Sequence, residues 1–83
     1  MYWVYVLQDD VGKWYIGYTS SLKRRIREYQ QGIGSKTTSR MINPRCIYRE
    51  GYLCRKDALS REKFLKGGSG YTYLKKQMRH FLS

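Results

Sequence analysis

Four residues of this chain carry chemically active groups at positions where a small folded protein usually places apolar side chains. Tyr5 and Tyr15 lie in two segments rich in aromatic and β-branched residues. Arg25 and Glu62 interrupt the apolar stripes of two expected helices. A charge in such a place costs free energy unless it is paired or used, so these are the positions where function is expected.

The two tyrosines are expected to lie on one face of a β-hairpin. Side chains alternate along a strand, so Tyr5 shares its face with Leu7, and Tyr15 shares its face with Gly17. A three-residue turn pairs Tyr5 with Gly17 and Tyr15 with Leu7, which places the phenols diagonally within reach of one ligand. Gly17 then removes the side chain that would crowd Tyr5. The alternative is that both are ordinary strand tyrosines, since the chain has nine.

Arg25 falls beside Leu22 and Tyr29 on a helical projection, at the edge of the apolar stripe. Its stem can follow the core while its guanidinium points at the sheet, where a bidentate contact with phosphate is the obvious use. The alternative is an arginine that reaches past the core to the surface.

Glu62 lies near the middle of an apolar stripe that contains Ala58, Leu59 and Leu65. A lone carboxylate is rarely buried without a partner. Two explanations remain open: an ion pair with an inward arginine such as Arg25, or ligation of a divalent cation. Mg²⁺ often takes one or two carboxylates and completes its shell with water and substrate phosphate.

The expected architecture is a single α+β domain over residues 1–83, in which a small three-stranded antiparallel sheet is flanked by helices in the order ββαβαα. Strands are expected at Tyr2–Gln8, Lys13–Tyr18 and Cys46–Leu53, with a turn at Asp9–Gly12 and a possible bulge at Gly51. Helices are expected from the capping hydroxyls of Thr19–Ser21 to about Gln31, at Arg55–Lys66, and at Tyr71–Leu82 with Tyr71, Leu74, Met78 and Phe81 on one side.

A polar loop from Gly32 to Arg45 is expected between these elements, where Pro44 argues against a helix. Seventeen Lys and Arg against six Asp and Glu give a net charge of +11. Such an excess favours a polyanionic partner, with nucleic acid ahead of a membrane surface or an acidic protein. A plain solvated surface is the alternative. The candidate phosphate contacts are Lys23, Arg24, Lys36 and Arg40.

Membrane and zinc functions are disfavoured. The longest apolar run, Trp3 to Leu7, is far shorter than the ~20 residues of a spanning helix. No secretion signal opens the sequence, so a cytoplasmic location is expected. Cys46 and Cys54 lack metal-site spacing and have only His80 to help them, so two reduced thiols in or near the core are expected.

These elements together resemble the GIY-YIG nuclease family over nearly the whole chain, and the short single-domain bacterial members most of all. The first motif appears as Trp3-Val4-Tyr5 and the second as Tyr15-Ile16-Gly17. The family's helix arginine matches Arg25, ten residues after Tyr15, and its metal-binding glutamate matches Glu62.

The resemblance implies hydrolysis of DNA phosphodiesters, in duplex or branched DNA, with Mg²⁺ or Mn²⁺ held by Glu62. It implies that Arg25 stabilises the transition state, that Tyr5 acts as general base directly or through water, and that Tyr15 positions the water or phosphate. A tyrosine base requires a lowered pKa, because a free phenol with a pKa of about 10 is mostly protonated at neutral pH. Supporting positions are Gly17, Tyr18 and Tyr29.

The chain departs from the family pattern at several positions. Trp3 replaces the first glycine, Tyr18 stands where relatives often carry Lys or His, and no C-terminal Asn motif is evident. Little base specificity is expected, because phosphate contacts carry no sequence information. Two rival functions remain: a non-catalytic binder whose sheet tyrosines stack on bases, and a nuclease fold that acts only inside a larger complex.

Overall fold

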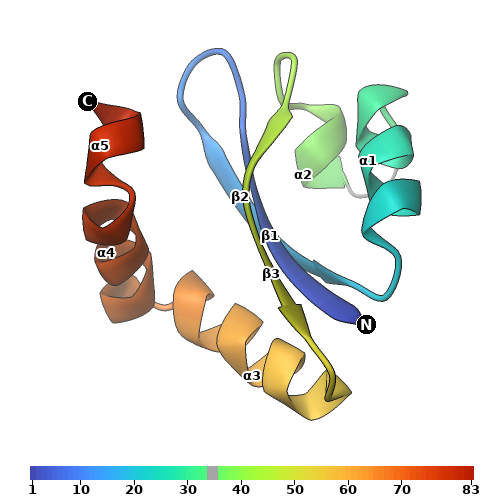
Figure 1. Cartoon of the computed structure of the whole chain (residues 1–83). Helices are drawn as coiled ribbons and strands as arrows, with labels where there is room; N and C mark the ends of the chain where they lie inside the picture. The colour runs from blue at the N-terminus through green and yellow to red at the C-terminus, as the bar shows by residue number, and fades with distance from the viewer. Residues whose placement is uncertain (34–35) are drawn as a thin grey trace.

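A three-stranded antiparallel sheet in the order β2-β1-β3 forms the centre of the molecule (Figure 1). The computed structural model describes residues 1–33 and 36–83, and the side chains of all of these except residues 36 and 37. The strands are β1 (Tyr2–Gln8), β2 (Trp14–Thr19) and β3 (Arg45–Tyr52). The helices are α1 (Leu22–Gln30), α2 (Lys36–Ser39), α3 (Arg55–Lys66), α4 (Gly68–Gln77) and α5 (Arg79–Leu82). The expected α+β class and the ββαβαα order are confirmed.

The sheet has two differently covered faces. In Figure 1, α1 and α2 lie on one side of it and α4 and α5 on the other, with α3 beneath. On what we call the α3/α4 face, Val4, Val6 and Ile16 pack with apolar residues of α3 and α4. On the opposite α1 face, Tyr5 and Leu7 pack with residues of α1. The side chains of β1 therefore alternate between the α3/α4 face and the α1 face.

The predicted hairpin register is confirmed. Tyr5 pairs with Gly17 and Leu7 pairs with Tyr15 across β1 and β2. The predicted bulge at Gly51 is wrong, because Gly51 pairs regularly with Trp3. The irregularity lies nearer the start of β3, where Tyr48 pairs with Val6 and Cys46 pairs with Leu7, so that one residue between them has no partner.

Two helix predictions need correction. The loop expected to be free of helix contains the single turn α2, and Pro44 does not prevent it because the turn ends five residues earlier, at Ser39. The last helix starts at Gly68 and is interrupted at Met78, whose φ of −99° and ψ of 17° end α4. Phe81 therefore does not continue the apolar side of α4 and is 59% exposed.

The start of α1 is organised by Thr19 and not by a capping side chain of Ser21. Ser21 is the N-cap residue but makes no side-chain capping bond. The Thr19 hydroxyl accepts a hydrogen bond from the Ser21 backbone N–H at 3.1 Å and donates one to the Ser21 carbonyl at 3.1 Å. This local turn orients the helix that carries Arg25.

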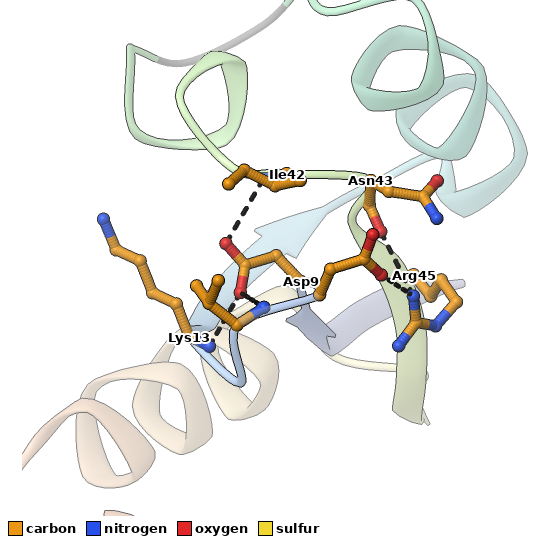
Figure 2. A network of polar contacts seen from close by, with 7 residues as sticks. Asp9, Lys13, Ile42, Asn43 and Arg45 are labelled. Carbon is orange, nitrogen blue, oxygen red and sulfur yellow. Dashed lines mark hydrogen bonds and ion pairs between the residues drawn. The ribbon is translucent and has the colours of Figure 1, made fainter.

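Asp9 joins the β1–β2 turn to the segment between α2 and β3 (Figure 2). Its buried carboxylate accepts backbone N–H bonds from Lys13 at 2.8 Å, Val11 at 3.1 Å and Ile42 at 3.2 Å. Burial alone would raise the pKa of this carboxyl, but the three N–H bonds outweigh burial and lower it. The hairpin turn and a segment 33 residues away are thereby held together.

None of the helices in the described part of the chain is long and apolar enough to cross a membrane.

Candidate active site

The two motif tyrosines form a pair on the α1 face. Their ring centroids lie 6.3 Å apart with an interplanar angle of 42°. Tyr5 is 1% exposed, and a Cβ added at Gly17 would lie 2.5 Å from its hydroxyl oxygen and 2.9 Å from the ring of Tyr15. Because β2 is an edge strand, the missing side chain lets the Tyr5 phenol lie over Gly17 toward the open edge of the sheet.

Arg25 has an unfulfilled hydrogen-bonding capacity. Its side chain is 29% exposed, and Nη1 lies 3.5 Å from the Glu28 carboxylate in an i,i+3 ion pair. Its Nε is buried and has no hydrogen-bond partner, which holds for no other side-chain atom of the described residues. A buried N–H without an acceptor is costly, so this donor suits a ligand oxygen that arrives with substrate.

Glu62 lies on the inward side of α3, between the fully buried Ala58 and Leu65. The apolar stripe is narrower than the sequence predicts, because Leu59 is 36% exposed. The suggested ion pair with Arg25 is wrong: the Glu62 carboxylate pairs instead with Lys66 Nζ at 3.2 Å, one helical turn away. Its side chain is 20% exposed. One flexible surface lysine leaves the carboxylate oxygens available for another cation.

Ionisable groups of four other elements, β2, α1, α3 and β3, act on the Tyr5 phenol; they are Tyr15, Arg25, Glu62 and Cys46. Burial is the largest influence and raises its pKa, and the neighbouring Tyr15 raises it further. Arg25 lowers the pKa of Tyr5, whereas Glu62 raises it. The four residues singled out from the sequence thus lie within electrostatic range of one hydroxyl. The net rise keeps that phenol protonated at neutral pH, so proton acceptance by Tyr5 requires further positive charge nearby.

The side chains at this site suit a divalent cation bound by few protein ligands better than a structural metal ion. No group of three or more His, Cys, Asp or Glu side chains capable of holding a metal occurs among the described residues. Glu62 alone, with water and phosphate oxygens, matches the way Mg²⁺ is commonly bound. The thiols offer nothing here: both are free, Cys46 is half-buried, and Cys54 is exposed, which corrects its expected place near the core.

Comparison with known proteins decides the family. Residues 1–76 match the GIY-YIG catalytic domain. The chain belongs to the GIY-YIG family. GIY-YIG domains are nuclease domains that hydrolyse phosphodiester bonds, and they generally use divalent metal ions.

Similar proteins of this GIY-YIG type are known as UPF0213 proteins. One from Streptococcus pneumoniae is 36% identical over 64 residues, which cover 77% of this chain and 65% of that protein. The chain therefore matches slightly less than two thirds of that relative's length. One from Haloquadratum walsbyi is 36% identical over 76 residues, covering 92% of this chain and 82% of the relative. The solution NMR structure of a UPF0213 protein from Bacillus halodurans superposes with a TM-score of 0.58 at 28% identity, covering 93% of this chain and 85% of that one.

The two supporting tyrosines of this GIY-YIG domain lie on different faces. Tyr29 is buried in the same cluster as Tyr5, where burial raises its pKa. Tyr18 packs on the α3/α4 face and stacks on Tyr2, with ring centroids 6.5 Å apart and an interplanar angle of 11°. Its hydroxyl accepts a hydrogen bond from Arg55 Nε at 3.3 Å. Any support from Tyr18 must therefore pass through β2, and both roles stay predictions.

The basic residues expected to contact phosphate are only partly described. Lys23 and Arg24 are exposed on α1, and Arg40 is exposed just after α2. The side chain of Lys36 lies outside the described residues. Arg45, expected in the polar loop, instead begins β3 and is paired with Asp10 of the hairpin turn, with Nη1 2.7 Å from Oδ1 (Figure 2).

Sequence reasoning missed Arg49. It is exposed on β3 and pairs directly with Tyr5 in the sheet register, so its side chain leaves the same face. The alternation of β3 could have shown this only if the irregularity between Cys46 and Tyr48 had been placed correctly. Tyr5 is therefore flanked by a glycine on one side and an arginine on the other.

Proposed function

We propose that residues 1–83 form one nuclease domain that cleaves DNA internally, using Mg²⁺ or Mn²⁺, and that substrate structure directs it more than sequence does. The observation that carries this proposal is that the rings of Tyr5 and Tyr15 lie 6.3 Å apart and that the charges of Arg25 and Glu62 both act on the Tyr5 phenol. These groups come from β1, β2, α1 and α3, so only the folded chain brings them within range of one another.

The reaction is the attack of water on phosphorus, with departure of the sugar oxygen on the opposite side. Arg25, whose Nε–H is buried without a partner, can turn its partly exposed guanidinium to donate to a non-bridging phosphate oxygen, where negative charge grows in the transition state. Tyr15 is half-buried and positions the attacking water or the phosphate. Glu62 would hold the cation, which when bound supplies a more acidic water and neutralises phosphate charge. Tyr5 is our candidate for accepting the water's proton, which it can do only as the phenolate; its own proton must first pass to solvent, and the positive charges of Arg25 and the cation would favour that loss.

The burial of Tyr5 argues against the rival function of a base-stacking binder. That function needs tyrosines displayed on an open sheet surface. Here both faces of the sheet are covered by helices, and Tyr5 is 1% exposed. A nucleobase stacks on the face of a ring, and the ring of Tyr5 offers no open face.

Cleavage assays with labelled linear and branched DNAs test the proposal. Glu62→Gln removes the charge and keeps the side-chain size, so cleavage with Mn²⁺ should fall by about a hundredfold or more while DNA binding is retained. The matched control is Asp57→Asn, the same change at an exposed acid on α3, which should cut like the native protein.

Equal cleavage by the two variants would remove Glu62 from the site. A native protein that binds Mn²⁺ and DNA but cuts no substrate in the panel would contradict a stand-alone nuclease. It would favour the reading in which the fold acts only inside a complex.

A further inference from the structure

An open groove runs along the α1 face beside the tyrosine pair. Its volume is about 520 Å³, and it is lined by residues of α1, by Gly32, by the segment from Thr38 to Pro44, and by β3. A pocket of this size can enclose a ligand of drug-like dimensions. The groove, which we call the α1–β3 groove, is not part of the four-residue cluster described above.

The groove combines an apolar floor with a polar rim. Tyr29 and Met41 are buried beneath it, and half-buried Cys46 completes the floor. Gln30 and Arg49 are exposed at the rim. None of the twelve lining residues is acidic. A flat apolar group with an attached anion matches this arrangement, because the group can lie on the floor while the anion meets the rim.

One wall of the groove is held in place before any ligand arrives. Asn43, Pro44 and Arg45 line it, and Asp9 binds the backbone N–H of Ile42 directly before them. Arg45 is further tied by its ion pair with Asp10 (Figure 2). A wall that is already ordered reduces the entropy lost on binding.

The groove continues from the proposed reaction centre. Arg49 lines the groove and pairs with Tyr5 in the sheet, and Tyr29 belongs to the same buried cluster as Tyr5. Gly17 flanks Tyr5 on the other strand, toward the open edge of the sheet. If a DNA strand places a phosphate next to Tyr5, the nucleotides on one side of that phosphate would therefore cross β3 and enter the groove.

We propose that the α1–β3 groove binds one or two unpaired nucleotides next to the phosphate that is cut, with a base on the apolar floor and a phosphate at Arg49. This rests on the proposed nuclease function and names its substrate class: DNA with a single-stranded arm. A base-paired duplex is far too wide for the groove, whereas a single strand can place its bases there.

Binding assays separate the groove from the reaction. All proteins carry Glu62→Gln so that no DNA is cut, and the probes are a duplex and the same duplex with a single-stranded arm of about six nucleotides. Arg49→Ala should weaken binding of the armed DNA about tenfold, the loss expected for one charge-assisted contact, and Gln30→Tyr should weaken it by filling the groove. The controls are Arg79→Ala on α5, matched to Arg49→Ala, and Gln31→Tyr, matched to Gln30→Tyr; neither Arg79 nor Gln31 lines the groove. Binding of the duplex should change no more in the test variants than in these controls.

Three outcomes can be told apart. Equal weakening of armed and duplex DNA, or no difference from the controls, overturns the groove proposal. Selective weakening of the armed DNA, in a chain whose native form cuts nothing, supports the groove and refutes the nuclease. Cleavage by the native protein without any effect of Arg49→Ala leaves the nuclease intact and removes only the groove.

Discussion

The two faces of the sheet are built from alternate residues of the same strand, yet they differ in chemistry. On the α3/α4 face, Val4, Val6, Leu65 and Leu74 are completely buried and carry no polar side-chain atom. On the α1 face, the buried cluster contains tyrosines, and the α1 that covers it carries Arg25, whose Nε has no partner. The comparison teaches that apolar packing on the α3/α4 face stabilises the fold. The α1 face can therefore hold polar groups that lower the stability of the fold.

Glu50 of the α3/α4 face is fully paired, in contrast to Arg25. Glu50 accepts hydrogen bonds from Tyr48 at 2.7 Å, Tyr52 at 2.8 Å and Arg61 Nε at 2.9 Å. Burial and the bond to Glu50 raise the pKa of Tyr52 to about 12. This network fastens β3 to α3 and leaves no capacity for a ligand.

The largest effect on stability is expected from Leu65→Ala, which tests the role of the α3/α4 face. Leu65 is fully buried, so truncation should lower the free energy of unfolding by about 2–5 kcal/mol. Leu59→Ala, on the same helix but 36% exposed, should cost much less. Urea denaturation measures both. Cleavage per folded molecule should be unchanged at low temperature in Leu65→Ala, and a large selective loss of cleavage would break the division between the faces.

Gly17→Ala tests the α1 face. The new methyl group would overlap the Tyr5 hydroxyl and the Tyr15 ring, so both phenols must shift, and a shift of this kind can reduce cleavage about a hundredfold. In the control, Gly51→Ala, the methyl group meets the flexible end of the Met1 side chain, which can move away, and lies 3.1 Å from the ring of Trp3, which must give by only a few tenths of an ångström. Cleavage that survives Gly17→Ala at the level of Gly51→Ala would show that the spacing of the phenols does not matter.

The smallest effect is expected from acid, through Glu50. Burial alone would raise the pKa of this carboxyl, but its bonds from Arg61, Tyr48 and Tyr52 lower it below its ordinary value. The carboxylate therefore stabilises the fold above its ordinary pKa, and this contribution is lost as the pH falls through the lowered one. Unfolding measured between about pH 6 and about pH 3 should depend less steeply on pH in Glu50→Gln. Equal slopes would mean that the network stabilises nothing.

Much of the fold was predictable because its signals are local. Alternation and turn length predict the register of Tyr5 with Gly17, and α3 begins and ends where its sequence predicts. The errors involve long-range or backbone-specific effects. The interruption at Met78 and the ties of Asp9 depend on contacts and dihedral angles that no spacing reveals.

The candidate site was predictable in its members but not in its surroundings. Periodicity shows that Glu62 turns inward, but it cannot show that Lys66, and not Arg25, is its partner. Arg49 was missed because its face depends on a single irregular residue upstream in β3. The face on which a side chain lies can be predicted from the sequence of its own helix or strand. Contacts between different helices and strands can be seen only in the folded structure.

That irregular residue has a consequence for how this protein can change in length. Ile47 is the position in β3 without a partner in β1, so its deletion would leave every remaining pair of the two strands aligned. A deletion inside β1 would instead exchange the two faces from that point onward, which moves valines to the α1 face and tyrosines to the α3/α4 face. Natural insertions and deletions among relatives should therefore accumulate at this position of the third strand and be absent from the first.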